Sequence, residues 1–163
     1  LINGDNVEPK EAIQEIVSNL GVADMIIPHF GQKDARTRIR RYVSSIFTFI
    51  VNTISGNKIN YYNGPVLHKT ENVKFWRSET VGYGYQAELI CRLLHEGVSH
   101  SEVVVKNSDR QWGASKAFAM SNFLSVANSL FRILWRRLEY TAFGLLTPGF
   151  DKVVKDDESR VDR

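Results

Sequence analysis

Amphipathic segments and short apolar runs alternate along this chain, and the alternation limits the folds that it can adopt. Residues 7–21 carry apolar side chains at helical spacing, and residues 23–30 form a short apolar run typical of a buried strand. The same alternation continues, and the further expected elements are a helix at 34–56, a short strand within 57–69, a helix from about Gln86 to Gly97, a strand at 100–107 and a long helix at 112–146.

Such alternation indicates an α/β fold with a largely parallel sheet. At 163 residues and 43% hydrophobic composition, the chain can build a core. Only about three strands are visible, however, and a parallel sheet needs cover on both faces. We therefore expect the later part of a larger Rossmann-like domain, whose N-terminal half precedes Leu1.

Composition excludes several classes of protein. The single cysteine, Cys91, rules out an internal disulfide framework and a cysteine zinc site, and four scattered histidines do not form a ligand set. A net charge of +3 does not favour nucleic acid as a partner. No apolar run reaches the roughly 18 residues that a membrane-spanning helix needs.

Polar side chains near the first residues offer oxygen ligands. Asp5, with Asn3 beside it, follows an apolar start in "LINGDN" and would suit a divalent cation at the carboxyl end of a strand. The alternative is a plain turn in which Asp5 caps the next helix.

Basic residues gather at the start of the expected helix 34–56. In "RTRIRRY", Arg40 and Arg41 belong to faces whose guanidinium groups suit a diphosphate. A solvated helix end is the alternative for this run. The later turn "NYYNGP" brings Asn60, Tyr62 and Asn63 together, either to line a pocket or simply to make the turn.

Two further groups lie at expected helix starts. Glu88 would orient an acceptor or interact favourably with the helix dipole. In "NSDRQWGASKAF", Arg110, Ser115 and Lys116 converge on a helix start, where backbone N–H groups attract anions. A capped helix without a ligand is the alternative there.

Read in order, these motifs resemble the later half of family 2 glycosyltransferases. The segments that carry the resemblance are "INGDN", "ADMIIP", "RIRRYVSS", "NYYNGP", "GYGYQAELICRLL" and "EVVVKNSDRQWGASKAF". The chain is most similar to the dolichol-phosphate mannosyltransferase branch, over residues 1–118. The resemblance implies a GT-A fold and transfer of a sugar from a nucleotide diphosphate sugar to a polyprenyl phosphate, with inversion.

The resemblance also implies roles for individual residues. Asp5 would hold Mg²⁺ or Mn²⁺, with Asn3 in place of the family's first aspartate. Glu88 matches the carboxylate after the sugar-side loop, and would be the base for a hydroxyl acceptor. The implied diphosphate ligands are Arg40 or Arg41, Arg110, Ser115 and Lys116, and the implied acceptor-side residues are Asn60, Tyr62 and Asn63.

The expected organisation has three parts: a partial catalytic domain at 1–118, an amphipathic helix at 119–147 and a polar, disordered tail at 148–163. The helix would lie on a membrane surface, on its own domain or on a second copy. We expect a cytoplasmic protein, peripheral at the inner face of the membrane if the helix binds lipid. The competing function is a non-catalytic interaction or membrane-surface module that retains this fold.

Overall fold

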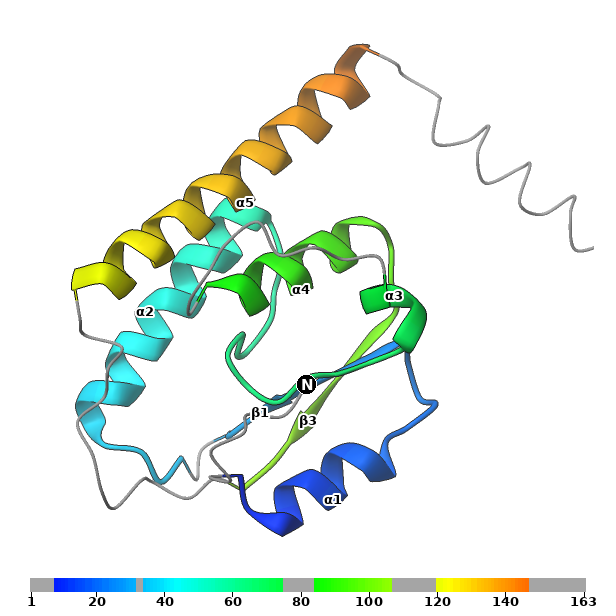
Figure 1. Ribbon diagram of the computed structural model, residues 1–163, viewed down its shortest axis with the longest axis vertical. Coiled ribbons are helices and arrows are strands. Elements are labelled where there is room, and N and C mark those ends of the chain that lie inside the picture. Colours follow the sequence, from blue (N-terminus) through cyan, green and yellow to red (C-terminus); the bar gives the residue numbers. More distant parts are fainter. Residues whose placement is uncertain (1–7, 32–33, 75–83, 107–119, 147–163) are drawn as a thin grey trace, which may run out of the picture.

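The computed structural model describes residues 8–31, 34–74, 84–106 and 120–146. These residues form a small α/β protein with one three-stranded sheet (Figure 1). In chain order its elements are α1 (Lys10–Ser18), β1 (Met25–His29), α2 (Arg38–Ser55), β2 (Leu67–His68), α3 (Thr70–Lys74), α4 (Tyr85–His95), β3 (His100–Val104) and α5 (Met120–Leu146).

The sheet is mixed, with strand order β2-β1-β3. β1 runs parallel to β3, with His29 opposite Val104, and antiparallel to the two-residue β2, with Met25 opposite His68. The expected α/β class is confirmed. Whether the fold is a GT-A domain remains a prediction.

Pro28 lies within the central strand β1. The N–H of Met25 and the carbonyl of His29 bond toward β3, so the backbone of Pro28 faces the β2 side. β2 pairs only with Met25 and Ile26. Proline therefore costs the sheet no ladder hydrogen bond at this position.

Each face of the sheet has its own apolar core. Met25 and Ile27 point to one face and pack in a cluster with residues of α2, α4 and α5. Ile26 and Val103 point to the opposite face and pack against α1. Helices thus cover both faces, with α1 alone on one side (Figure 1).

α2 begins at Arg38, four residues after the start that the sequence predicted. Asp34 accepts hydrogen bonds from the backbone and side chain of Arg36, which fixes a turn there instead. Thr37 then caps the helix, and Gly56, with a left-handed φ of 79°, ends it. The single-turn helix α3 was not predicted.

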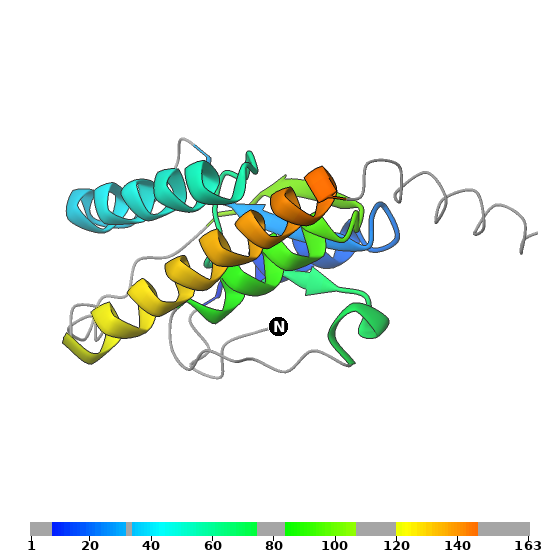
Figure 2. The same ribbon diagram turned by 90° about the horizontal axis from the view of Figure 1, so that it is seen from above.

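α5 packs against α4 and lies beside the C-terminal end of α2 (Figure 2). Its Ile133 belongs to the main core cluster, and Gly84 lets the start of α4 approach the buried Ser129. Arg137 donates to the last carbonyls of α2, those of Thr53 and Ile54, at 2.8 and 3.1 Å. The predicted long helix is confirmed over 120–146, and residues 112–119 lie outside the described part.

Candidate functional site

The carboxyl ends of β1 and β3 form one edge of the sheet, because the two strands are parallel neighbours. The N–H of Val105 donates to the carbonyl of His29 at 2.8 Å, so the chain leaves both strands at the same place. α2 begins on this side as well (Figure 1). Open α/β sheets bind ligands at such edges, and we call it the carboxyl edge.

A cluster of side chains around Arg36, the first arginine of "RTRIRRY", lies beside the carboxyl edge, before α2 begins. The guanidinium of Arg36 lies between the rings of Phe30 and Tyr61, at 4.7 and 4.9 Å from their centroids. It also donates to both carboxylate oxygens of Asp34 and to the Tyr61 hydroxyl. Burial raises the pKa of Tyr61, so this hydroxyl remains protonated. Arg36 is therefore a structural residue that fixes the turn between β1 and α2.

Arg40 and Arg41 lie in the first turn of α2 and are half-buried. The side chain of Arg41 forms no hydrogen bond or ion pair with the other described residues, whereas Arg40 has an interaction partner. Because α2 begins beside the carboxyl edge, both residues lie on that side of the molecule. Their predicted contact with a diphosphate remains a prediction.

The loop that follows α2 places the three predicted acceptor-side residues differently. Asn60 donates from its backbone N and its Nδ2 to the Glu102 carboxylate of β3, at 2.7 and 2.9 Å. Tyr62 is fully buried, and its hydroxyl donates to Oδ1 of Asn52 at 2.7 Å. Its contacts are those of a core residue. Asn63 is exposed.

Gly64 completes this loop by packing against β1. A Cβ at this position would come within 2.9 Å of Cγ of Pro28. The Gly64 carbonyl also accepts a hydrogen bond from the buried side chain of Gln86 in α4. Contacts with β1, β3 and α4 thus fix the position of the loop at 60–64 beside the carboxyl edge.

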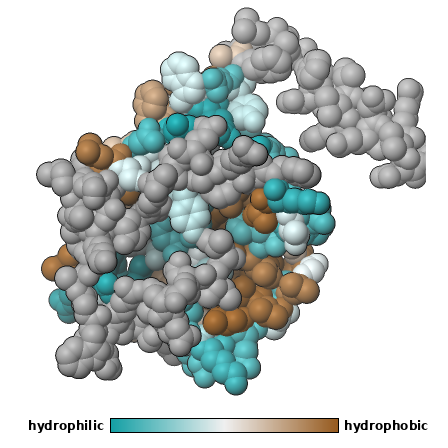
Figure 3. Space-filling view, in the orientation of Figure 1, coloured by the Kyte–Doolittle hydropathy of each residue, from teal (hydrophilic) through white to brown (hydrophobic). Residues whose placement is uncertain are grey.

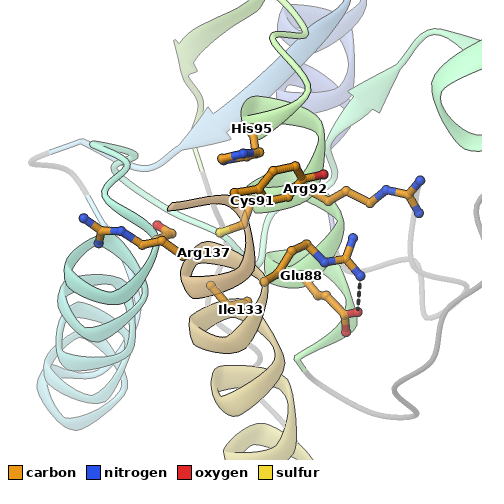
Figure 4. A pocket seen from close by; sticks show the side chains of 9 residues that line it. Glu88, Cys91, Arg92, His95, Ile133 and Arg137 are labelled. Carbon is orange, nitrogen blue, oxygen red and sulfur yellow. Dashed lines mark ion pairs between the residues drawn. The ribbon is translucent and has the colours of Figure 1, made fainter. Parts of the chain in front are cut away.

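Glu88 lies in the first turn of α4, but its side chain is buried between helices. One carboxylate oxygen is 4.0 Å from Nη2 of Arg136 on α5, and only 4% of the Glu88 side chain is exposed (Figure 4). A base at this position would have to break the ion pair before it reached an acceptor. The described geometry therefore gives Glu88 a role in joining α4 to α5.

The same pair of helices lines a small pocket with Cys91, His95 and Arg137 (Figure 4). Burial raises the pKa of the Cys91 thiol to about 11, so the thiolate nucleophile is absent at neutral pH. The His95 ring lies 3.7 Å from the ring of Tyr140. Arg137 is engaged by the end of α2. These contacts indicate packing, without the components of covalent catalysis.

The remaining predicted residues lie outside the described part of the chain: Asn3, Asp5, Arg110, Ser115 and Lys116. Among the residues that are described, no three carboxylate, histidine or cysteine side chains gather to hold a metal ion. The metal prediction thus depends wholly on Asn3 and Asp5.

None of the helices in the described segments is long and apolar enough to cross a membrane. Comparisons with protein-family models, with curated proteins and with solved structures found no match for this chain.

Proposed function

We propose that this protein binds a nucleotide diphosphate sugar and transfers the sugar to a polyprenyl phosphate. One observation supports the proposal most directly: β1 and β3 are parallel neighbours, so their carboxyl ends share an edge with the start of α2. The segment with Arg110, Ser115 and Lys116 follows β3 in the chain. We infer that its basic groups and those at the start of α2 serve one ligand.

The chemistry follows from the charge on the leaving diphosphate. Guanidinium groups of Arg41 and Arg110 would pair with phosphate oxygens, and the hydroxyl of Ser115 would donate to them. Asp5 and Asn3 are the residues that would hold Mg²⁺ or Mn²⁺, which neutralises charge on a leaving diphosphate. A phosphate acceptor is already an anion at neutral pH. Transfer to it needs no general base, which is compatible with the burial of Glu88.

Titration calorimetry with pyrophosphate, GDP and UDP, with and without Mn²⁺, tests the proposal. We expect metal-dependent binding that weakens about tenfold or more in Asp5→Ala and Arg110→Ala, since a charge-assisted hydrogen bond contributes about 1.5–3 kcal/mol. Arg41→Ala should also weaken it. Arg38→Ala is the matched control, because Arg38 is an exposed arginine on the same helix. The affinity of this variant for the three ligands should differ less than twofold from that of the unmodified chain.

Two results would refute the proposal. The first is the absence of metal-dependent binding to the unmodified chain for all three ligands. The second is binding that Asp5→Ala and Arg110→Ala leave unchanged. Far-UV circular dichroism of each variant separates loss of a ligand contact from loss of the fold.

A non-catalytic interaction module is the second candidate, and a different observation favours it. α2 and α5 both expose large apolar side chains along their outer sides. Such surfaces mark interaction sites in folded proteins. This candidate requires no diphosphate, so the same titration separates the two functions.

A further inference from the structure

α2 exposes a row of large apolar side chains on its outer side. Its exposed large side chains recur at helical spacing, and each keeps between 36% and 70% of its surface exposed; they are Ile39, Tyr42, Val43, Ile46, Phe49 and Ile50. The opposite side of the helix buries Val51 and packs Phe47 and Ile54 against the main core cluster, beside the polar Ser44, Asn52 and Ser55. The outer row therefore adds apolar surface beyond what the contact with the core uses.

The Asn52 side chain, which faces inward from α2, finds its hydrogen-bond partners within the protein. Asn52 accepts from Tyr62 and from the N–H of Ile59, and its Nδ2 donates to the Ile59 carbonyl at 2.9 Å. Rotating α2 to bury its apolar side would therefore break these bonds inside the core. The outward orientation of the six apolar residues, which we call the α2 face, is consequently fixed by the fold.

The spacing of the α2 face suits another helix. Ile39 and Ile46 are seven residues apart, and so are Tyr42 and Phe49. Each aromatic residue follows its isoleucine by three positions. This is the a and d pattern by which two helices interlock their side chains, with β-branched isoleucine at a. Apart from Ile39, the exposed positions are symmetric about Ile46, which lies close to the middle of the 18-residue helix.

The area of the α2 face is close to what a dimer requires. Its six side chains expose roughly 700 Å² on one protomer, against about 800 Å² per partner in an interface of standard size. No charged residue belongs to the face. Two copies therefore meet there without repulsion between like charges.

The charges at the helix ends favour one orientation. Arg38, Arg40 and Arg41 all lie in the first turn of α2, and no acidic residue lies beside them there. A parallel pair would bring six arginines together. An antiparallel pair keeps the two sets of arginines at opposite ends; each set then lies near the carbonyl end of the other α2, where Arg137 already donates to the carbonyls of Thr53 and Ile54.

We propose that two copies of this chain associate through the α2 face, as an antiparallel helix pair with a twofold axis at Ile46. Phe49 of one copy then packs against Val43 of the other, and Tyr42 packs against Ile50. Arg40 and Arg41 lie more than 100° around the helix from the centre of the face, at about 100° per residue. This inference therefore does not depend on the proposed enzymatic function.

A lipid surface fits the described contacts less well. An interfacial helix usually carries lysine or arginine along its polar side over its whole length. On α2 the arginines are confined to the first turn. On neighbouring α5, Arg136 pairs with Glu88 and Arg137 donates to the end of α2, so both are engaged by the protein. Another exposed apolar group, Val17, Leu20 and Val22, is smaller and lies around the end of α1 (Figure 3).

Sedimentation and light scattering of the full chain test the proposal. The expected mass is about twice the 18.6 kDa of one chain at micromolar concentration. Phe49→Glu should raise the dissociation constant at least a hundredfold, because two carboxylates would be buried. Leu124→Glu is the matched control, since Leu124 is equally exposed but lies on α5, and it should leave the dimer intact.

Disulfide trapping tests the position of the axis. Ile46→Cys places two thiols within reach at a twofold axis and should give a covalent dimer under mild oxidation. Ser45→Cys, exposed on the same helix but 100° away, should not. The native Cys91 is buried and does not interfere.

Three outcomes would overturn the proposal. A monomeric mass at all concentrations excludes the pair, and equal trapping of Ile46→Cys and Ser45→Cys excludes the axis. A protein that is monomeric in buffer, but floats with anionic vesicles unless Phe49 is changed to glutamate, would assign the α2 face to lipid. Unchanged circular dichroism in Phe49→Glu confirms that any loss of mass reflects the interface.

Discussion

Gly84→Ala tests the packing of α4 against α5 most sharply. A Cβ at this position would overlap both Oγ and Cβ of Ser129, well inside van der Waals contact. The backbone of Gly84, with φ −89° and ψ −13°, is one that alanine adopts without strain. Ser129 is buried in the middle of α5 and cannot turn away, so the helix itself would have to move.

The expected cost is that of overpacking a well-packed core, about 2 kcal/mol of unfolding free energy. For a protein of this size that corresponds to a fall in Tm of roughly 4–8 °C. Ser129→Gly alone should cost about 1 kcal/mol, because glycine is unfavourable inside a helix. The double variant removes the clash and should cost little more than Ser129→Gly, which gives a coupling of about 2 kcal/mol.

Urea denaturation of the four proteins in this cycle measures the coupling. Gly97→Ala is the control, because Gly97 has φ +81° and open space around it, so its cost arises from the backbone alone. That cost should add to the cost of Ser129→Gly without coupling. If Gly84→Ala is within 0.5 kcal/mol of the parent, or if its cycle is additive, the described contact between α4 and α5 is wrong.

Three further predictions concern buried groups. Burial lowers the pKa of His68 to about 4, so the unfolded chain binds the extra proton between about pH 6.5 and pH 4, and stability falls as the pH falls through that window. His68→Gln should recover about 1 kcal/mol at pH 5 relative to pH 7 in urea titrations; an unchanged pH dependence would contradict this. Cys91, with its pKa raised to about 11, should react with a disulfide reagent at pH 8 only as fast as the protein unfolds. Glu88→Gln should cost about 2 kcal/mol, because Arg136 loses its partner while it is only 30% exposed, and adding Arg136→Met should recover much of the loss.

Hydrophobic periodicity was enough to predict most of the fold. The helices around α1, α2, α4 and α5 and the strands β1 and β3 follow from apolar spacing and from the ends marked by glycine. Periodicity does not encode strand direction, and so the antiparallel β2 was not foreseen. The five-residue α3 is too short for a helical period to be recognised.

The residues around the carboxyl edge were harder to predict, because their partners are distant in sequence. Arg36 bonds to Tyr61 across 25 positions, and Asn60 bonds to Glu102 across 42. The isolated glutamate in "SEVVV" is the one signal that could have identified the second contact. Tyr62 was interpreted as an acceptor-side residue from the polar turn around it. The sequence pattern does not show that the buried Tyr62 hydroxyl bonds to Asn52, ten positions earlier in the chain.

The amphipathic pattern of α2 separates the surface proposed for the dimer from the arginines proposed for the diphosphate. A periodic stripe shows that a helix has an apolar side, but the core does not have to be its partner. In this protein the side with Val51 and Asn52 faces inward, because Val51 belongs to the main core and Asn52 is bound by Tyr62 and the Ile59 backbone. Arg41 lies on that side, whereas Ile46 lies on the outer one. Pairing of two copies through Ile46 would therefore leave the arginines beside the carboxyl edge accessible, so diphosphate affinity should be the same in the dimer and in the Phe49→Glu monomer.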